Sequence, residues 1–484
     1  MLRKSLFFDN IITGMDINAQ VLRLLFANLP HTPTDGQREA ADAIVRFLFD
    51  PDPDSAFVLK GYAGTGKTTL VSALIQTLPQ LKVRSVLLAP TGRAAKVLSN
   101  YSGRQALTIH KKIYATTADA NGLLRCSRVP NKHSYTLFIV DEASMFGEDN
   151  DSGRNLLDDL VSYVKEGSHC RLMLIGDTAQ LPPVGSPISP ALDCNYLSRI
   201  TSLNIYTAEL TEVVRQTETS GILFNSTLIR NQIASGNDIA ETPVFQINEI
   251  NDVVRIDGGE LEDILNREYS DKGSEEVVVI CRTNKRANIF NNAIRNRILF
   301  RDDQLNTGDY LMVVKNNYFW TDEDASLGFI ANGDIAEILR LRNFEEMYGF
   351  RFAMATLRFI DYPDAPEIEC RILLDTLYSE SPSLTADESR RLYEQVALDY
   401  ADLPTKGDRL KAIRNDPYYN ALQVKFAYAL TCHKTQGGQW DTAIIDQGFL
   451  PDGVIDREYL RWLYTALTRA KKQVFLLNFD DIMF

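Results

Sequence analysis

The sequence predicts an α/β protein with two similar halves, each built on a parallel sheet, and a small β-barrel inserted into the second half. From about residue 55, short β-branched runs alternate with helical patterns, the order expected of strand–helix units around a parallel sheet. The runs are almost entirely apolar, as strands covered on both faces are. Between about 305 and 375, strands and turns follow one another instead, which favours an antiparallel barrel.

The order of these runs divides the chain into four parts. Strands of the first half are expected at 56–61, 84–90, 135–142 and 171–177, and strands of the second half at 276–283, 442–448 and 473–479. The parts are an N-terminal lead-in (1–33), a first α/β domain (34–215), a second α/β domain (216–304 and 426–484) and the inserted barrel (305–425).

Two smaller features are expected within these parts. The segment at about 112–136 shows no strong periodicity of apolar residues. We expect it to form a small hairpin insertion in the first domain. The segment at about 380–416 is acidic, and we expect it to form helices that pack on the outside of the barrel. In that stretch Thr385 and Glu388 have the spacing of a capping box, which predicts a helix over 383–400.

The composition is that of a globular protein without a membrane anchor. Apolar residues make up 45% of the 484, so a sizeable core is expected. No apolar run approaches the roughly 20 residues of a membrane helix, and no signal peptide is recognised at the N-terminus. The six cysteines are scattered and form no CxxC pair, which favours free thiols in a reducing cytoplasm over a zinc site or disulfides.

The charge is unevenly distributed along the chain. The net charge of −13 argues against a polyanion partner. Three segments, 79–140, 277–301 and 417–440, nevertheless hold eighteen Lys and Arg residues and a single acid, Asp119. A polyanion site can exist on an acidic protein if such segments converge in the fold.

The stretch GYAGTGKTT (61–69) matches the pattern GxxxxGK[ST] between a predicted strand and a predicted helix. Glycines let backbone N–H groups approach phosphate oxygens, and the helix N-terminus adds its dipole. Lys67 is expected to reach the β- and γ-phosphates, and Thr68 to bind Mg²⁺. The residues expected to hold the nucleotide phosphates are Gly61, Gly64, Thr65, Gly66, Lys67, Thr68 and Thr69.

Two further strand ends carry polar residues suited to phosphate hydrolysis. Asp141 and Glu142 follow a buried strand, where Asp141 can hold Mg²⁺ and Glu142 can activate a water molecule. The stretch LIGDTAQLPPVG (174–185) ends another strand and offers Gln180 as a neutral contact to the γ-phosphate or the water. Alone, each would also fit a solvated strand end or a surface turn.

Taken in order, these motifs resemble those of superfamily 1 helicases, in the branch of RecD-like and phage Dda-like enzymes. The resemblance runs from about residue 33 to the end of the chain. It implies two RecA-like P-loop NTPase domains, a pin-like hairpin in the first and an SH3-like barrel in the second. It also implies that Gln37, in TDGQREAA (34–41), reads the adenine ring.

In this family, arginines reach the γ-phosphate when the two domains close. Arg215, in LTEVVRQ, and Arg469, in YTALTRAKK, are the residues that match. A guanidinium can neutralise the charge that spreads over the γ-oxygens during transfer. The alternative for Arg469 is a cation that caps the end of its own helix. Lys471 and Lys472 are expected to be ordinary surface cations.

The three basic segments coincide with motifs that resemble contacts to a nucleic-acid strand. Hydroxyls, amides and backbone N–H groups can hold phosphates without reading bases. For Thr283 and Asn284, ordinary helix capping is an equally good explanation, and the aromatic run 317–320 favours barrel core over base stacking. The candidate strand contacts are Thr91, Arg93, Thr108, His110, Thr283, Asn284, His433 and Thr435.

The resemblance implies an ATP-dependent DNA helicase that uses ATP and Mg²⁺. Its partners would be single-stranded DNA and single-strand/duplex junctions, bound without sequence preference, with 5′→3′ movement. The alternative is a strand-stimulated ATPase or translocase, or a switch subunit of a larger complex, that does not separate strands. A metabolic P-loop kinase needs neither the second α/β half nor the strand motifs.

Overall fold

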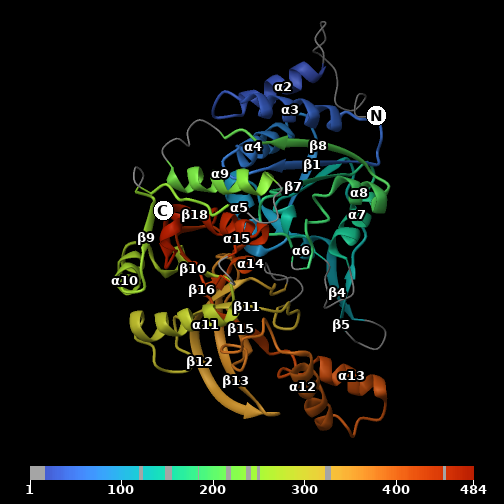
Figure 1. Cartoon of the computed structure of the whole chain (residues 1–484). Coiled ribbons are helices and arrows are strands. Elements are labelled where there is room, and N and C mark those ends of the chain that lie inside the picture. Colours follow the sequence, from blue (N-terminus) through green and yellow to red (C-terminus); the bar gives the residue numbers. More distant parts are fainter. Residues whose placement is uncertain are drawn as a thin grey trace.

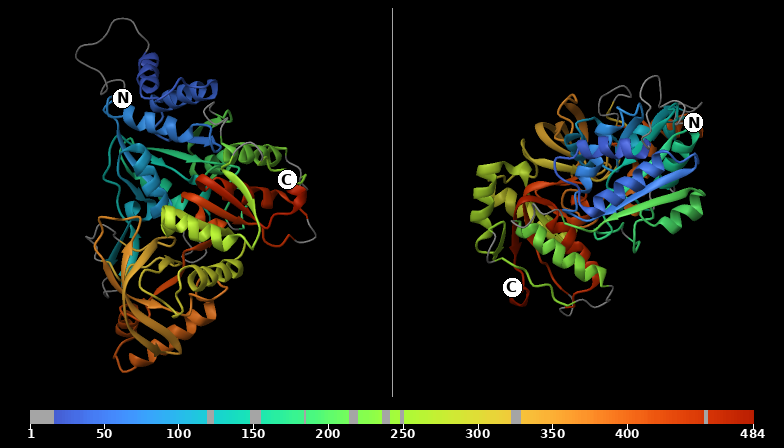
Figure 2. Two further views of the ribbon diagram at one scale, coloured as in Figure 1. Left: turned by 90° about the vertical axis from the view of Figure 1, so that its left-hand side faces the viewer. Right: turned by 90° about the horizontal axis from the view of Figure 1, so that it is seen from above.

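The computed structural model describes residues 17–118, 124–147, 155–183, 185–213, 220–235, 241–247, 251–321, 329–450 and 454–484 (Figure 1). Two parallel sheets and a closed barrel confirm the fold class predicted from the sequence. The barrel lies at the opposite end of the molecule from helix α2 (Ile17–Ala27), as Figures 1 and 2 both show. Within the described ranges, no helix has both the length and the apolar character needed to cross a bilayer.

The first domain contains a six-stranded parallel sheet in the order β3-β2-β6-β7-β1-β8. Its central strands are buried along their whole length because helices cover both faces. Helices α2, α3 (Asp35–Leu48), α4 (Lys67–Thr77) and α5 (Gly92–Ser102) cover one face, and α6 (Ile109–Ile113), α7 (Leu156–Glu166) and α8 (Cys194–Thr201) the other. The strands are β1 (Ser55–Gly61), β2 (Arg84–Ala89), β3 (Ala106–Thr108), β6 (Thr136–Val140), β7 (Arg171–Gly176) and β8 (Asn204–Leu210).

The second domain repeats this plan with a five-stranded parallel sheet in the order β16-β10-β17-β18-β9. Helices α9 (Gly221–Ala234) and α15 (Arg457–Leu467) pack on one face, and α10 (Leu261–Lys272) and α11 (Asn284–Ala293) on the other. The short helix α14 (Cys432–Thr435) follows the edge strand. The strands are β9 (Val253–Ile256), β10 (Val277–Cys281), β16 (Ala429–Thr431), β17 (Trp440–Asp446) and β18 (Ala470–Leu477).

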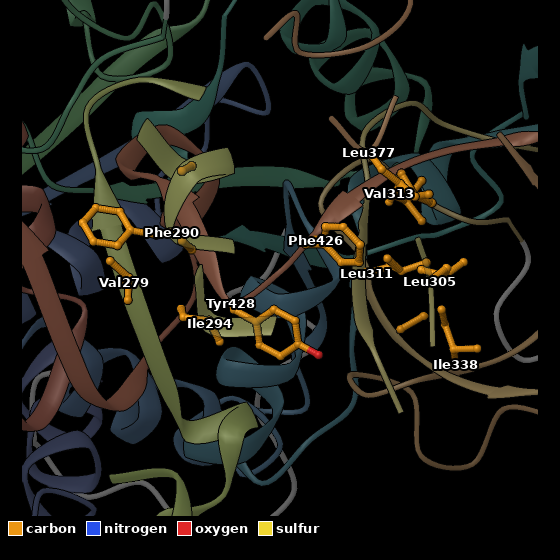
Figure 3. Packing of buried hydrophobic residues seen from close by; sticks show 14 of the residues in the cluster. Val279, Phe290, Ile294, Leu305, Leu311, Val313, Ile338, Leu377, Phe426 and Tyr428 are labelled. Carbon is orange, nitrogen blue, oxygen red and sulfur yellow. The ribbon is translucent and has the colours of Figure 1, made fainter. Parts of the chain in front are cut away.

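The barrel closes through five strands, and its core is continuous with that of the second domain. In Figure 3, Val279 and Phe290 of the second domain belong to the same buried cluster as Leu311, Val313 and Phe426 of the barrel. The barrel is therefore attached to the second domain through apolar packing as well as through the chain. Its strands are β11 (Tyr310–Val313), β12 (Ile335–Met347), β13 (Phe350–Phe359), β14 (Ile368–Leu373) and β15 (Leu422–Phe426).

Two additions to these domains were predicted and are present. Strands β4 (Tyr114–Ala118) and β5 (Leu124–Arg128) form an antiparallel hairpin that projects from the first domain (Figure 1). Helices α12 (Ala386–Asp399) and α13 (Lys406–Arg414) decorate the barrel, and α12 begins with the predicted capping box of Thr385 and Glu388.

Candidate ATP cleft and strand groove

A cleft of about 720 Å³ lies between the two α/β domains, beside the loop that joins β1 to α4. The first domain contributes the predicted phosphate and metal residues to its wall, and the second domain contributes cations and a carboxylate. Among the lining residues are Lys67, Thr68, Thr69, Asp141, Glu142 and Gln180 from the first domain, and Glu276, Thr468, Arg469 and Lys471 from the second.

The loop between β1 and α4 is curled by its glycines and by its own hydrogen bonds. Gly64 and Gly66 have φ angles of 75° and 76°, and a Cβ at Gly64 would lie 2.5 Å from Leu223. Lys67 Nζ donates to the carbonyl of Gly61 at 2.7 Å, so the amine lies within the curl. Such a loop at a helix N-terminus is suited to bind phosphate.

The acid pair at the end of β6 is held in place by neighbours. Asp141 accepts a hydrogen bond from the hydroxyl of Tyr101 at 2.7 Å and another from the backbone N–H of Glu142 at 2.9 Å. Glu142 has a φ of 54°, in the left-handed region that costs a non-glycine residue energy. Desolvation raises the pKa of Glu142, and the charge of Arg469 partly opposes this. A raised pKa suits a carboxylate that must accept a proton.

The hydroxyl of Ser144 lies between Gln180 and Glu142 and is near both side chains. Ser144 Oγ is 3.5 Å from Gln180 Oε1 and 3.4 Å from Glu142 Oε2, within reach of both acceptors. Gln180 is buried and lines the cleft. The amide and the carboxylate therefore reach the same space.

Arg469 makes the contacts of a helix cap and also lines the cleft, while its action on a γ-phosphate stays a prediction. It is only 3% exposed, and its guanidinium donates to the carbonyl of Thr465 in the last turn of α15 and to the carbonyl of Gly438, at 3.1 and 3.2 Å. It thus caps its own helix, and it also lines the cleft opposite Lys67. Arg215 lies outside the described residues.

A second cavity, of about 470 Å³, lies where the first domain, the second domain and the barrel meet. It brings together residues from the first and third basic segments, far apart in sequence. We call it the strand groove. Its lining includes Thr91, Arg93, Thr108 and His110 from the first domain, Phe329 and Asn332 from the chain leading into β12, and His433, Lys434, Gln436 and Trp440 from the second domain.

Comparisons with known proteins agree with this architecture. An AAA domain matches residues 32–242, and a UvrD-like helicase C-terminal domain matches residues 426–477. The chain is therefore similar to an AAA domain in its first half and to a UvrD-like helicase domain near its C-terminal end.

Two curated relatives show the extent of the similarity. The ATP-dependent DNA helicase dda of Enterobacteria phage T4 is 34% identical over 186 residues, which is 38% of this chain and 39% of that protein. The ATP-dependent RecD2 DNA helicase of Deinococcus radiodurans is 25% identical over 429 residues, 86% of this chain and 46% of that protein. The chain thus spans less than half the length of either relative. A solved structure of the Pif1 helicase from Bacteroides with ADP-AlF3 and ssDNA has 18% identity and a TM-score of 0.46, with 93% of each chain covered.

Several residues predicted from the superfamily 1 motifs lie behind the cleft wall. Gln37 is fully buried, completes a capping box with Thr34, and donates to the carbonyl of Gly66 at 3.4 Å. Gly61 and Thr65 form the inner side of the phosphate loop, where Thr65 Oγ1 donates to the carbonyl of Tyr62 at 2.8 Å. Adenine reading by Gln37 stays a prediction, because its side chain does not line the cleft.

The predicted strand contacts divide into two groups. Thr91 and Thr108 cap α5 and α6 and also line the groove, as do Arg93, His110 and His433. Burial lowers the pKa of His433, which favours the neutral ring, and a neutral imidazole can offer a hydrogen bond to a phosphate. The second group comprises Thr283, which caps α11, its neighbour Asn284, and Thr435, which is buried and donates to the carbonyl of Cys432; none of the three lines the groove.

The aromatic run at 317–320 has mixed surroundings. Trp320 packs against the barrel cluster and donates to the carbonyl of Asn420 at 2.8 Å, as expected of core. The ring of Tyr318 stacks on Phe329 with centroids 5.0 Å apart, and Phe329 lines the groove.

One residue that the sequence did not single out joins the two domains. The hydroxyl of Tyr464, on α15, accepts from the backbone N–H of Ala63 at 2.8 Å and donates to Asp177 at 2.6 Å. Next to it, Thr465 accepts from the backbone N–H of Leu181 at 2.8 Å. No local pattern predicts these contacts, since the partners of Tyr464 lie 287 and 401 residues away in the sequence.

Proposed function

We propose that this chain is an ATP-dependent DNA helicase that binds Mg²⁺-ATP in the cleft and a single DNA strand in the groove. The observation that carries the proposal is the composition of the cleft wall: Lys67 and Glu142 come from one domain and Arg469 from the other. Hydrolysis would then require that the domains close, so each cycle of ATP binding and product release would move one domain against the other along the strand.

The first domain supplies the groups for metal and nucleophile. Thr68 and Asp141 both line the cleft and offer the hydroxyl and carboxylate oxygens that Mg²⁺ accepts together with water and phosphate oxygens. In that position a bound Mg²⁺ supplies charge neutralisation at the phosphates. Glu142 accepts a proton from the attacking water, and Gln180 orients that water or the γ-phosphate.

Cations on both walls stabilise the charge that develops on the γ-oxygens. Lys67 acts from the phosphate loop and Arg469 from the second domain. The resemblance to superfamily 1 motifs adds Arg215 to this set, by its place in the motif order.

The groove fits a strand held through its backbone. The lining groups are hydroxyls, imidazoles, amides and cations, which hold phosphate without reading bases, so binding is expected to be largely independent of sequence and weakened by salt. The names of the relatives support DNA as the nucleic acid, and the family branch supports 5′→3′ movement. The hairpin of β4 and β5 and the barrel would meet the duplex at the junction.

The test is ATP turnover with and without a single-stranded oligonucleotide in the presence of Mg²⁺. We expect the oligonucleotide to raise turnover in the wild type and Lys67→Ala to abolish it, because nothing else in the described chain takes the place of that amine in the loop. Lys165→Ala is the matched control, since Lys165 lies on α7 and pairs with Asp54 at 3.5 Å. Normal turnover in Lys67→Ala would contradict the assignment of the cleft.

A further inference from the structure

The segment Gly437–Trp440 lies between the ATP cleft and the strand groove. Gln439 lines the cleft and Trp440 lines the groove, one residue apart in the chain. Arg93, from α5 of the first domain, lines both cavities. The wall that separates the two sites is therefore thin, and side chains from both domains form it.

On the cleft side, this segment is tied to Arg469 at two points. The guanidinium of Arg469 donates to the carbonyl of Gly438 at 3.2 Å, and the backbone N–H of Trp440 donates to the carbonyl of Arg469 at 3.0 Å. A shift of the segment would therefore move Arg469 relative to the γ-phosphate position.

On the groove side, the same segment is held by Arg93. The guanidinium carbon lies 3.9 Å from the centre of the Trp440 ring, and Nη2 donates to the carbonyl of Gln439 at 3.3 Å. Its Nη1 is buried and has no hydrogen-bond partner among the described residues. Burial lowers the pKa of Arg93, as expected for a cation held over an aromatic face away from water.

The two glycines allow this close approach. A Cβ at Gly437 would lie 2.8 Å from the Cβ of Ala94, and a Cβ at Gly438 would lie 2.6 Å from the Trp440 ring and 3.0 Å from Arg93 Cδ. The segment thus packs directly on α5 with no space for side chains between them.

We propose that Arg93 and Trp440 form a coupling clamp, through which a strand in the groove sets the position of Arg469 in the cleft. The inference rests on the proposed function. Arg93 is then a positioning residue: a strand that engages its free Nη1 or displaces it from the ring moves the segment 438–440 and Arg469 with it. A coupling route of this kind is established by energetic measurement and not by proximity alone.

The experiment compares Arg93→Lys and Arg93→Met with the wild type. ATP turnover is measured against oligonucleotide concentration, which gives a maximal stimulation and a half-saturating concentration. Because lysine keeps the charge but not the planar stacking of arginine, the clamp predicts that both variants lower the maximal stimulation by about fivefold to tenfold. We expect the half-saturating concentration to rise by a smaller factor than the maximal stimulation falls, since Arg93 is one of several groups that line the groove.

Arg282→Met is the matched control. Arg282 also lies over an aromatic ring, 5.2 Å from Tyr459, and donates to a carbonyl, that of Phe449, but every one of these residues belongs to the second domain. Its loss should leave the maximal stimulation as in the wild type. Trp440→Phe provides a second variant if Arg93→Met is unstable on thermal melting, and its smaller ring should give a maximum between those of Arg93→Met and the wild type.

A simple phosphate contact would behave differently. Arg93→Lys would then be nearly normal, and Arg93→Met would raise the half-saturating concentration with an unchanged maximum, which would overturn the clamp while leaving the helicase proposal intact. A wild-type ATPase that ignored the oligonucleotide would overturn the proposed function and the clamp together.

Discussion

At the scale of single residues, Arg469 both makes local hydrogen bonds within its own domain and lines the cleft between the two domains. Its hydrogen bonds to Thr465 and Gly438 hold it within its own domain, and its position on the cleft wall makes it available to a phosphate bound by the other. If Arg469 acts on the γ-phosphate as we propose, these local bonds would pre-organise the guanidinium and little reorganisation would be needed when the transition state forms.

Replacement of Arg469 by alanine should therefore affect chemistry more than binding. We expect kcat to fall by about 10³-fold or more, while affinity for an ATP analogue changes little, because the charge on the γ-oxygens is largest in the transition state. Rapid-mixing turnover and analogue titration measure the two quantities. Lys472→Ala is the control, since Lys472 pairs with Asp441 outside the cleft. An unchanged kcat in Arg469→Ala would return the residue to a capping role.

Tyr464→Phe tests the contact between the domains. Without the hydroxyl, the N–H of Ala63 and the carboxylate of Asp177 both lose a buried partner, so the free energy of unfolding should fall by about 1–3 kcal/mol. Tyr269→Phe is a matched control, because the hydroxyl of Tyr269 is buried but has no partner among the described residues. Equal denaturation midpoints for the two variants would show that the bridge adds no stability.

At the scale of elements, the contact between the barrel and α5 contains a buried acid. A Cβ at Gly92 would lie 2.2 Å from the hydroxyl of Tyr362 and 2.6 Å from Asp334, so a glycine at the start of α5 is what allows the barrel to approach. Nearby, Lys96 pairs with Asp361 at 3.6 Å. Burial raises the pKa of Asp334 to about 8, and the charge of Asp361 adds to the increase.

This raised pKa predicts a pH dependence with a definite sign. Between about pH 4 and pH 8 the folded state keeps the proton on Asp334 and the unfolded state loses it, so stability falls as pH rises, by up to about 1.4 kcal/mol per unit. Asp334→Asn removes this dependence and should be more stable than the wild type at pH 8, with a difference that shrinks toward pH 5. Thermal melting at both values measures it.

Asp364→Asn is the control, because Asp364 is exposed on the same part of the barrel. If Asp334→Asn differed from the wild type by the same amount at pH 5 and pH 8, Asp334 would not be protonated in the folded state.

The elements that could be predicted from the sequence are those with a strong local signal. Apolar runs identified β1, β2, β6 and β7, and the spacing of Thr385 and Glu388 identified the start of α12. Strands β3, β9 and β16 were missed because a run of three or four residues is too short to show an alternation of apolar and polar residues. Strand β8 was missed because it is an edge strand with alternating exposed positions.

In the candidate site, too, the residues in local motifs could be predicted and the contacts between distant residues could not. Its phosphate loop and acid pair are local motifs, so the cleft residues could be predicted. The Tyr464 bridge and the pairing of Arg93 with Trp440 join residues hundreds of positions apart, and no local pattern records such contacts. Gln37 is different, because its contact with Thr34 is a local capping box that the spacing of TDGQ contains, and the resemblance assigned it to the adenine ring instead.

At the scale of the whole molecule, residues of the first and second domains line both the cleft and the strand groove. The barrel shares its core with the second domain (Figure 3) and contacts α5 of the first, and residues of all three parts line the groove. The hairpin of β4 and β5 projects from the first domain (Figure 1). If the domains close on ATP as we propose, closure would also move the barrel and the hairpin relative to each other, as strand separation would require.

The most direct test of this account is unwinding of two partial duplexes, one with a 5′ single-stranded tail and one with a 3′ tail, with Mg²⁺-ATP and with Lys67→Ala as the inactive control. The account predicts that the wild type opens the 5′-tailed duplex and leaves the 3′-tailed duplex intact. Strand-stimulated ATP turnover with neither duplex opened would contradict strand separation and leave a translocase or a switch subunit; opening of the 3′-tailed duplex alone would contradict the direction of movement.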